Sequence, residues 1–385
     1  MNNAATSLRP AANAAAASLA IKHIEPIAVS LPMMKPMKMA GVLITAADNV
    51  LVKLELAGGH IGWGEAASAH SMTGETVESM MAAIRHMAPS LAEMDGADIA
   101  AVSQRMDQLM YYNQSAKSAV EMALHDALGK ATGKPVYDLL GGKKRSRVPV
   151  LWLLGTGSIE GDVAEAKAKH AAGFVAFKVK VGVGDPSDDA LRTRKVCEAL
   201  GKGLLISADA NQGFSLEQAL AYVKAVEGAG LDFFEQPIAA HNIEGMAKLA
   251  AATRIPLGID ESLHGIDDLK QHHEQRAAQG CSLKTIKLGG LRGVMRAAGL
   301  CQQLGMNVNL ACKAAESGIA AASLMHLAAA VPAVAWGVSI TNQYLADDIV
   351  RATVKVVDGH AEVPAGAGLG VEVDEAKVRK YTRTM

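Results

Sequence analysis

The sequence is poor in the features that mark several classes of protein. Phe, Trp and Tyr make up only 4% of the 385 residues, and no segment interleaves basic and aromatic residues as base-stacking surfaces do. The formal net charge is −1, which gives no electrostatic reason for nucleic acid or an anionic membrane to bind. No apolar run approaches the roughly 18 residues that a spanning helix needs. We therefore expect neither nucleic acid nor a membrane as a partner.

Cysteine is also scarce. The four cysteines form neither a Cys-x-x-Cys pair nor the Cys/His spacing of a zinc finger; they are Cys197, Cys281, Cys301 and Cys312. This pattern is typical of reduced residues in a cytoplasmic protein, which is the localisation we expect. Residues 1–20 are rich in Ala and Asn. They could be a weak targeting segment, but we expect a disordered tail.

The pattern of apolar residues changes along the chain. Residues 21–147 begin with strand-like segments at 21–31 and 50–66, the second of which contains a Gly-Gly turn. Helix-like periodicity follows from residue 76 to residue 139, and the last long helix is expected to end at Gly133. Strands followed by helices predict a compact α+β module.

Residues 148–345 alternate regularly between apolar segments and amphipathic, alanine-rich stretches. The apolar segments begin about 25 residues apart, the size of one βα unit of a barrel. They lie at 148–154, 176–181, 204–209, 231–236, 257–260, 283–288, 306–311 and 333–338. Eight strands with seven helical connections predict a (β/α) barrel, and a doubly wound open sheet is the weaker alternative. Residues 346–385 are expected to return to the first module.

Charged residues stand where consecutive strands of this region end. Three acids end the third, fourth and fifth strands, and four lysines lie on the second and sixth: Asp209, Glu235, Asp260, Lys178, Lys180, Lys284 and Lys287. The carboxyl ends of barrel strands meet at one face, where barrel active sites lie. Each acid alone could instead be a surface residue or a helix cap. Three acids in register, flanked by strand lysines, favour a functional site.

Three carboxylates in one barrel mouth would repel one another without a counter-charge. Mg²⁺ or Mn²⁺ would supply it, because such hard cations prefer carboxylate oxygen. Zinc fits less well, since no His or Cys joins the set. A metal bound to a substrate carboxylate would stabilise the enediolate that forms when the α-proton leaves. We therefore expect a small-molecule carboxylate as substrate.

The lysines on the second and sixth strands suggest acid/base chemistry. Lys180 and Lys284 could face opposite sides of one bound substrate. An amine base needs a lowered pKa, and burial, the cation and a neighbouring ammonium all act in that direction. Lys178 would be that neighbour, and it could also hold the substrate carboxylate.

The segments KVK, DANQG, EQP, DES and KTIKLGG together resemble the enolase superfamily, specifically its muconate-lactonizing subgroup. The intervals fit that subgroup: 29 residues from Lys180 to Asp209, then 26 to Glu235, 25 to Asp260 and 24 to Lys284. The similarity runs through nearly the whole chain. The segments KPMKMAG, SAKSAVEMALHDALGKATGKPVYDLLGG and VPVLW look like muconate cycloisomerases in particular.

The resemblance implies a modified TIM barrel, (β/α)₇β, with an α+β capping domain. The capping domain would comprise residues 21–147, the barrel residues 148–345, and the returning segment residues 346–385. A homo-oligomer, plausibly an octamer, is implied by the resemblance alone.

The resemblance also implies roles for single residues. Asp209, Glu235 and Asp260 would bind the metal. Lys180 and Lys284 would be the acid/base pair. The choice of Lys284 rather than Lys287 rests on the family pattern, because strand parity leaves both open.

Further residues are candidates for substrate contacts or for orienting the carboxylates and lysines. Asn211 and Glu261 fit the orienting role. Trp152 could line the pocket or belong to the core. Muconate cycloisomerases carry an acidic residue just after the Trp-Gly of the last strand, whereas this chain has Ser339, which weakens the case for muconate itself. Glu316 could take over a polar role or cap the helix that begins there.

Two methionine-containing segments, 32–42 and 67–75, are expected to be loops that close over the barrel mouth and set specificity. Their methionines could form an adaptable lid or belong to the core of the capping module. Lys35 and Lys38 could attract a second substrate carboxylate, or they could be solvated.

These expectations define a divalent-metal-dependent isomerase that moves a proton α to a carboxylate. Muconate-type cycloisomerisation comes first, racemisation or epimerisation of an amino-acid derivative second, and dehydration of a hydroxy acid third. A Schiff-base lysine aldolase is a remote alternative, because it would leave the three carboxylates without a purpose. A non-catalytic binding protein would leave both the acids and the lysines unexplained.

Overall fold

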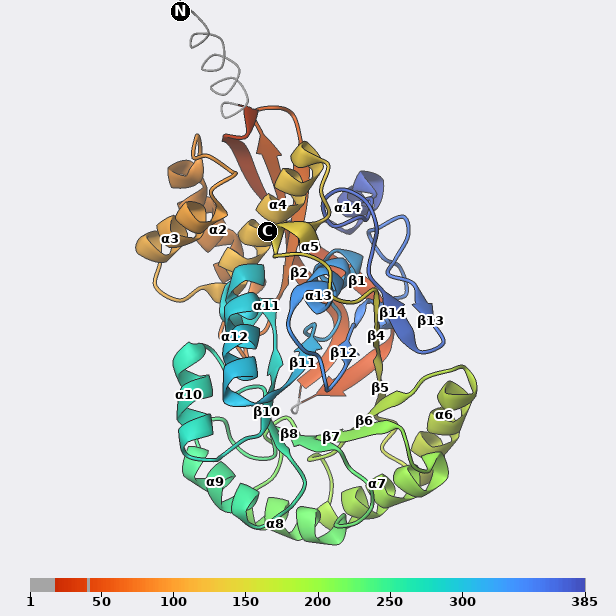
Figure 1. Ribbon diagram of the computed structural model, residues 1–385. Helices are drawn as coiled ribbons and strands as arrows, with labels where there is room; N and C mark the ends of the chain where they lie inside the picture. Colours follow the sequence, from red (N-terminus) through yellow and green to blue (C-terminus); the bar gives the residue numbers. More distant parts are fainter. Residues whose placement is uncertain (1–17, 40–41, 385) are drawn as a thin grey trace, which may run out of the picture.

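A computed structural model describes residues 18–39 and 42–384 of the chain. The tail expected over residues 1–20 therefore lies, up to residue 17, outside the described residues. The described part forms a capping domain of antiparallel strands and helices above a barrel of parallel strands and helices (Figure 1). Among the described helices, none combines the length and the apolar character that a membrane crossing requires.

The capping domain begins with an antiparallel three-stranded sheet and continues with helices. Its elements are β1 (Ile21–Met39), β2 (Val42–Leu56), β3 (Ile61–Ala67), α2 (Val77–Leu91), α3 (Ile99–Leu109), α4 (Gln114–Thr132) and α5 (Val136–Leu139). The sheet order is β1-β2-β3, with the expected Gly58-Gly59 turn between the last two strands. The segment 32–42, expected as a loop, is largely strand, because β1 remains paired with β2 as far as Met39.

Helix α4 packs very closely on β3 because the strand presents glycines to it. A Cβ added to Gly62 would stand 2.0 Å from the carbonyl oxygen of Ala123, and one added to Gly64 would stand 1.9 Å from that of Ala119. Most of α4 is buried, and it ends at Gly133, whose φ of 68° is left-handed. The predicted helix end at Gly133 is confirmed.

Eight parallel strands follow in chain order around the barrel. They are β5 (Leu151–Leu154), β6 (Ala176–Lys180), β7 (Leu205–Asp209), β8 (Phe233–Glu235), β9 (Leu257–Ile259), β10 (Gly280–Leu283), β11 (Asn307–Ala311) and β12 (Val338–Ser339). Each strand pairs with the next along the chain, and a parallel bridge between Val150 and Val338 joins the last strand to the first. This order confirms the barrel and excludes the doubly wound alternative, in which the strand order reverses.

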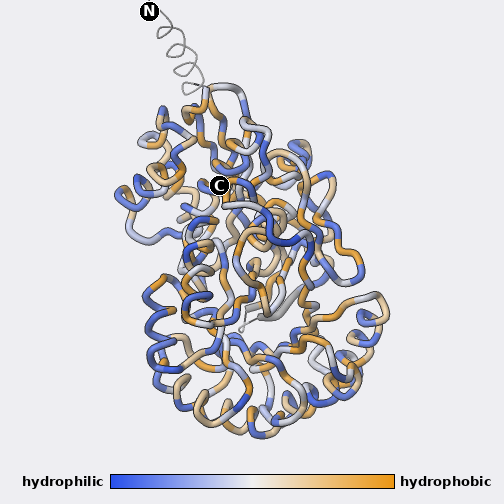
Figure 2. The backbone as a smooth tube through the Cα atoms, viewed as in Figure 1, coloured by the Kyte–Doolittle hydropathy of each residue, from blue (hydrophilic) through white to orange (hydrophobic). Residues whose placement is uncertain are grey.

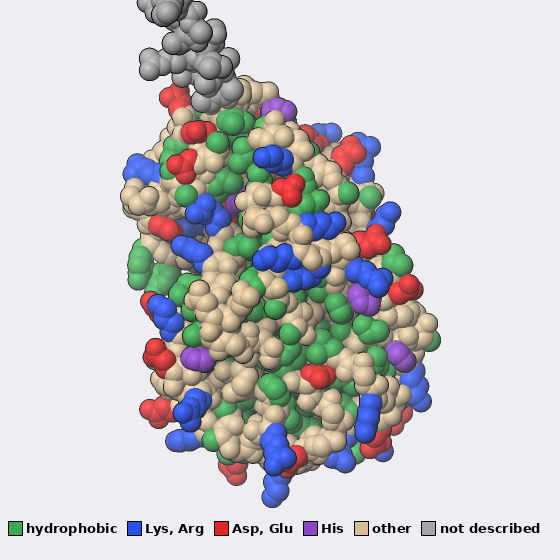
Figure 3. Space-filling view, viewed as in Figure 1, with side chains coloured by type: hydrophobic (Ala, Val, Ile, Leu, Met, Phe, Trp, Pro, Cys, Tyr) green, Lys and Arg blue, Asp and Glu red, His purple; other side chains and the backbone are tan. Residues whose placement is uncertain are grey.

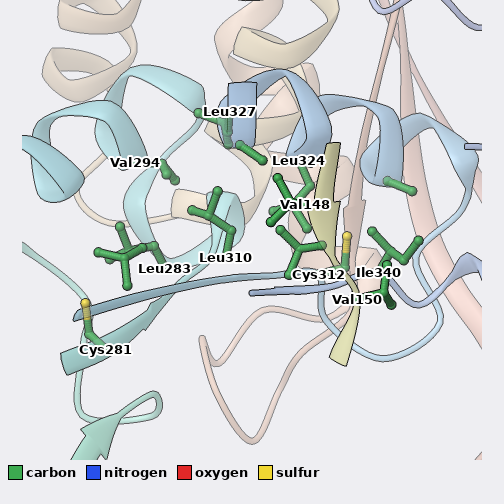
Figure 4. Packing of buried hydrophobic residues seen from close by; sticks show 14 of the residues in the cluster. Val148, Val150, Cys281, Leu283, Val294, Leu310, Cys312, Leu324, Leu327 and Ile340 are labelled. Atoms are coloured by element: carbon green, nitrogen blue, oxygen red, sulfur yellow. The ribbon is translucent and has the colours of Figure 1, made fainter. Parts of the chain in front are cut away.

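Helices on the outside of the barrel connect these strands. They are α6 (Ile159–Ala171), α7 (Pro186–Leu200), α8 (Leu216–Ala225), α9 (Ile243–Ala251), α10 (Ile266–Glu274), α12 (Leu291–Leu304) and α13 (Gly318–Ala330). Hydrophobic and hydrophilic residues alternate along the helices from α6 to α10 (Figure 2), as expected for helices with one face on a core. Helix α13 differs, since all its residues are buried. In Figure 4, Val294 of α12 and Leu324 and Leu327 of α13 pack near the strand residue Leu310.

Two expected strand positions, those of the sixth and the last strand, need correction. The sixth strand is 280–283 rather than 283–288, because residues 285–288 form the one-turn helix α11 (Thr285–Leu288), which Gly289 ends at a φ of 73°. The last strand is 338–339 rather than 333–338. Trp336, before it, instead stacks on Phe233 inside the barrel with ring centroids 4.0 Å apart.

The segment 148–154, expected as one strand, is divided between two sheets. Its start belongs to β4 (Arg147–Pro149), which pairs with the C-terminal β14 (His360–Glu362), itself paired with β13 (Val356–Val357). A short 3₁₀ helix, η1 (Asn342–Tyr344), and α14 (Glu375–Tyr381) complete the elements. The C-terminal segment also contacts the capping domain, where Lys53 Nζ lies 2.9 Å from Glu375 Oε1.

The surface carries charges of both signs. Figure 3 shows Lys and Arg interspersed with Asp and Glu over the visible face. This mixture matches the formal net charge of −1 and leaves no large field of one sign on that face.

The close packing of β3 on α4 predicts opposite effects for two glycine substitutions. Gly64→Ala should lower the free energy of unfolding by about 1–3 kcal/mol, since its methyl group overlaps the α4 backbone. Gly299→Ala, within α12 and with open space around its Cβ, should raise it by about 0.5–1 kcal/mol. Chemical denaturation of both variants measures the difference; equal effects would contradict this account of the packing.

Candidate active site

The three carboxylates expected as metal ligands lie side by side at the carboxyl ends of neighbouring strands. Asp209 is the last residue of β7, Glu235 the last of β8, and Asp260 directly follows β9. Asp209 is paired in register with Glu235 across β7 and β8. Their exposed fractions are 3%, 2% and 1%. Carboxylates buried this deeply need compensating positive charge.

Lysine ammonium groups supply that charge in the described structure. Lys180 Nζ lies 2.5 Å from Asp209 Oδ2, and Lys178 Nζ pairs with Glu235 Oε2. Asp260 pairs with two lysines, Lys284 at 2.6 Å and Lys287 at 2.7 Å. The structure therefore brings together the four lysines and three carboxylates that the sequence placed at the strand ends.

Neighbouring polar groups hold these side chains in place. Asn211 Oδ1 accepts a hydrogen bond from Lys180 Nζ, and Asn211 Nδ2 donates to Glu261 Oε1 at 3.0 Å. Glu261 and Asn211 both line the same cavity as the carboxylates. Lys287 is fully buried and also donates to the backbone oxygens of Asp260 and Ser282.

The sequence reasoning missed two residues of this network. Ser282 Oγ donates to Glu235 Oε1 at 2.9 Å, and the Gln236 side chain accepts from the backbone nitrogen of Asp260 at 2.9 Å. Ser282 stands two residues before Lys284, so strand parity would place both on the inner face. That parity is the signal that could have found Ser282. Because the sixth strand was expected at 283–288, Ser282 fell outside it.

The charges of the site raise the pKa of two of its lysines. Burial opposes the charge of Lys284, but Asp260, Glu261 and Glu235 outweigh it and raise its pKa. The pKa of Lys178 is raised in the same way by Glu235 and Asp209. At both lysines the charge of the facing carboxylates outweighs burial. Burial and then Asp260 raise the pKa of Glu261 to about 7.

The donor chemistry of the site fits a hard divalent cation. The three buried carboxylates lie at the ends of adjacent strands. The described residues that line the cavity include one imidazole, that of His70, and one thiol, that of Cys312, and both lie on other segments. Among residues 18–39 and 42–384, no three Asp, Glu, His or Cys side chains are gathered as a ready ligand cluster; each carboxylate is bound to lysine instead. The buried carboxylates need positive charge beside them, which lysines provide here. A divalent cation bound to the carboxylates would provide it as well.

A cavity of about 150 Å³ lies over these groups, between barrel and capping domain. The capping domain contributes Ile44 and the segment 68–72, which belongs to the second expected specificity loop. Met72 is part of this wall, and its sulfur lies 3.8 Å from Lys284 Nζ. Lys35 is exposed and does not line the cavity, and the side chain of Lys38 lies outside the described residues.

Trp152 lies outside the cavity. Its neighbours on β5, Leu151 and Leu153, line the cavity, so the intervening side chain points to the outer face. There its indole Nε1 donates to Glu165 at 3.0 Å and its ring lies 3.5 Å from the ammonium of Lys169. Of the two roles considered, core packing against α6 is the one that this placement supports.

Glu316 and Ser339 occupy different positions around the cavity wall. Glu316 is buried behind it, where its carboxylate accepts a hydrogen bond from the backbone nitrogen of Lys313 at 2.8 Å. It is not the cap of α13, since Ser317 fills that role. Ser339 lines the cavity directly, and its buried hydroxyl has no hydrogen-bond partner among the described residues.

With this geometry established, comparison with known proteins defines the class. Residues 23–141 match the N-terminal domain of mandelate racemase / muconate lactonizing enzymes, and residues 162–377 match the enolase C-terminal domain-like family. The chain belongs to the mandelate racemase/muconate lactonizing enzyme family of the enolase superfamily, in its muconate-lactonizing subgroup. The resemblance read from the sequence is confirmed, and enzymes of this family depend on a divalent metal.

Similar relatives and solved structures include muconate cycloisomerases. Muconate cycloisomerase 1 of Rhodococcus opacus is 31% identical over 373 residues, covering 95% of this chain and 99% of the relative. The muconate lactonizing enzyme of Pseudomonas fluorescens, complexed with muconolactone, has a TM-score of 0.91 at 32% identity and covers 95% of this chain and 100% of that one.

Two further solved structures are those of enzymes named for other isomerisations. An N-succinyl Arg/Lys racemase of Bacillus cereus has a TM-score of 0.90 at 28% identity, covering 95% of this chain and 98% of its own. A dipeptide epimerase of Cytophaga hutchinsonii, complexed with Mg and the dipeptide D-Ala-L-Val, has a TM-score of 0.88 at 28% identity, covering 94% and 98%. Cycloisomerases, racemase and epimerase are all isomerases, and this chain is an enzyme of that class.

The outward orientation of Trp152 predicts that it supports the fold and not substrate binding. Trp152→Phe should leave KM within about twofold of the wild type while lowering the free energy of unfolding by about 1–2 kcal/mol, since it loses the hydrogen bond to Glu165. Leu153→Ala, the adjacent inward-facing change, should raise KM. A marked rise in KM for Trp152→Phe would contradict the orientation.

Proposed function

We propose that this enzyme abstracts or delivers a proton at the carbon α to a substrate carboxylate, through an enediolate intermediate. The observation that carries the proposal is the position of two lysines on opposite sides of the cavity. Lys180 ends β6 and Lys284 directly follows β10, and these strands stand four places apart in the eight-stranded order. Two strands four apart in a closed ring of eight face each other across the barrel.

The surrounding contacts support acid/base roles for this pair. Both ammonium groups line the cavity, and each is oriented by an acceptor: Asn211 for Lys180, and Asp260 for Lys284. Lys287 is turned away from this task, since it donates to two backbone oxygens as well as to Asp260 and has no exposed surface. The residues that touch a substrate in the cavity would therefore be Lys180 and Lys284.

We propose Asp209, Glu235 and Asp260 as the residues that hold Mg²⁺ or Mn²⁺. A bound divalent cation would offset the carboxylate charge that raises the pKa of Lys178 and Lys284, and it would withdraw electron density from the substrate carboxylate. Ser282 and Gln236 hold Glu235 and Asp260 in position, and Lys178 balances the charge of Glu235 from the neighbouring strand.

Muconate-type cycloisomerisation is the reaction we place first. Its support is the similarity to muconate cycloisomerases over nearly the whole of both chains. Cycloisomerisation requires one proton to be moved at the α-carbon, which a single lysine can accomplish while the second stabilises charge. Dehydration of a hydroxy acid uses the same proton abstraction and has no further observation in its favour.

Racemisation or epimerisation of an amino-acid derivative is the second candidate. It is favoured by the presence of a lysine on each side of the cavity, because inversion of a stereocentre needs a base on one face and an acid on the other. The similarity to the N-succinyl Arg/Lys racemase and the dipeptide epimerase supports it as well.

Exchange of the α-proton in D₂O tests the lysine assignment. With Mg²⁺ present, NMR should show cyclisation of cis,cis-muconate or deuterium incorporation into one of a panel of N-succinyl amino acids and dipeptides. Lys180→Met and Lys284→Met should each lower the rate by about 10²- to 10⁴-fold, because each removes a proton-transfer group. Lys224→Met, an exposed lysine of α8, should leave it unchanged; full activity in either cavity variant would contradict the proposal.

Metal removal provides a separate test. Dialysis against EDTA should abolish turnover, and Mg²⁺ or Mn²⁺ should restore it, whereas Asp209→Asn should weaken metal binding measured by calorimetry. A Schiff-base aldolase would instead remain active in EDTA and would be trapped by borohydride with a carbonyl substrate. Activity that survives EDTA would therefore overturn the metal-dependent mechanism.

A further inference from the structure

One lysine of the cavity forms no direct ion pair among the described residues. Lys178, Lys180 and Lys284 are each paired with a carboxylate. Lys313 lines the same cavity from the turn after β11, yet its ammonium group has no hydrogen bond or ion pair to any residue in the described part of the chain. A partly buried ammonium without a hydrogen-bond partner loses hydration free energy that no direct hydrogen bond replaces.

The turn that carries Lys313 is firmly held. The carbonyl oxygen of Lys313 accepts a hydrogen bond from Thr341 Oγ1 at 2.7 Å, and its backbone nitrogen donates to Glu316 Oε2 at 2.8 Å. Ala315, two residues on, has a left-handed φ of 69°, and Asn49 of the capping domain donates to its carbonyl oxygen at 3.1 Å. Strained backbone that several contacts maintain is characteristic of functional turns.

A second unsatisfied donor lies on the adjacent strand. Ser339 is paired with Ala311 across β11 and β12, and its carbonyl oxygen accepts from the backbone nitrogen of Cys312 at 2.8 Å. Ser339 lines the cavity, and its hydroxyl oxygen is buried and has no partner among the described residues. Lys313 and Ser339 thus present an ammonium and a hydroxyl from neighbouring strand ends, and neither has an acceptor.

These two donors face the carboxylates proposed to bind metal. In the order of the barrel, β11 and β12 stand four places from β7 and β8, which end on Asp209 and Glu235. A molecule that fills the cavity would therefore have one end at the carboxylates and catalytic lysines and the other at Lys313 and Ser339.

The charges around Lys313 leave room for an anion. Glu316 and Asp48 attract its ammonium and Lys284 repels it, and burial, the largest influence, lowers its pKa. Asp48 is paired with Arg383 at 3.3 Å, and Glu316 already binds the Lys313 backbone. A carboxylate ligand would restore the charge balance and accept from both free donors.

We propose that Lys313 and Ser339 form a subsite for a second carboxylate of the substrate, at the end of the cavity opposite the reacting carbon. The inference rests on the proposed function, which places the first carboxylate at Asp209, Glu235 and Asp260. It defines the substrate class as dianionic: a dicarboxylate, or an amino acid acylated with a diacid. A dipeptide is disfavoured, because its far end is an ammonium group that Lys313 would repel.

Binding of a matched pair of probes tests the subsite without turnover. Adipate carries two carboxylates, and its monomethyl ester carries one. With Mg²⁺ present, calorimetry should show that the wild type binds adipate about 10- to 100-fold more tightly than the ester, since a charge-assisted hydrogen bond is lost in the ester. Lys313→Met should abolish this preference by weakening adipate and leaving the ester unchanged. Lys313→Arg should retain it, and Ser339→Ala should reduce it by about three- to tenfold.

Controls separate the subsite from effects on folding and on the proposed function. Lys224→Met should keep the wild-type preference, and circular dichroism should confirm that each variant is folded. The subsite is refuted if the wild type does not distinguish the probes, or if Lys313→Met weakens both equally. If no acid exchanges its α-proton while the preference for adipate still depends on Lys313, the proposed reaction fails and the subsite stands.

Discussion

The balance of charge in the barrel mouth is the constraint on which the rest of the site depends. Asp209, Glu235 and Asp260 are buried on adjacent strands, where uncompensated carboxylates would strongly destabilise the fold. The chain meets this constraint with lysines on β6 and around β10, placed so that each carboxylate has a cationic partner. The groups that form these buried ion pairs are the ones that we propose bind a cation and transfer protons.

The capping domain completes the cavity and is joined to the barrel by a further buried acid. Glu65 of β3 accepts hydrogen bonds from the backbone nitrogen of Ser317 at 2.9 Å and from Asn49 at 2.7 Å. It therefore sits at the N-terminus of α13, where the helix dipole favours an acceptor. This contact lies beside the turn that carries Lys313, and it links the cap to the wall of the cavity that we propose recognises the substrate's far end.

The fold and the meeting of the charged side chains could be predicted from the sequence largely because both follow from short periodic patterns. The 25-residue spacing of apolar segments predicted the strand order, and acids at consecutive strand ends predicted which side chains would meet. Errors arose where the pattern was ambiguous over a few residues. The alternation in 283–288 suits a strand, yet Gly289 turns the backbone into the one-turn helix α11. The pairing of the lysines with carboxylates could not be read from the sequence, because it depends on contacts between neighbouring strands.

The sequence by itself determined the family, the barrel and the identity of the charged residues, since these depend on residue type and local spacing. Only the tertiary structure decided which face of β5 carries Trp152, which donors lack partners, and that Lys313 and Ser339 share one wall. These facts depend on contacts between residues far apart in the chain, such as Asn49 with Ala315. No local pattern encodes such contacts, because burial and pairing arise only when the strands close into a ring beneath the cap.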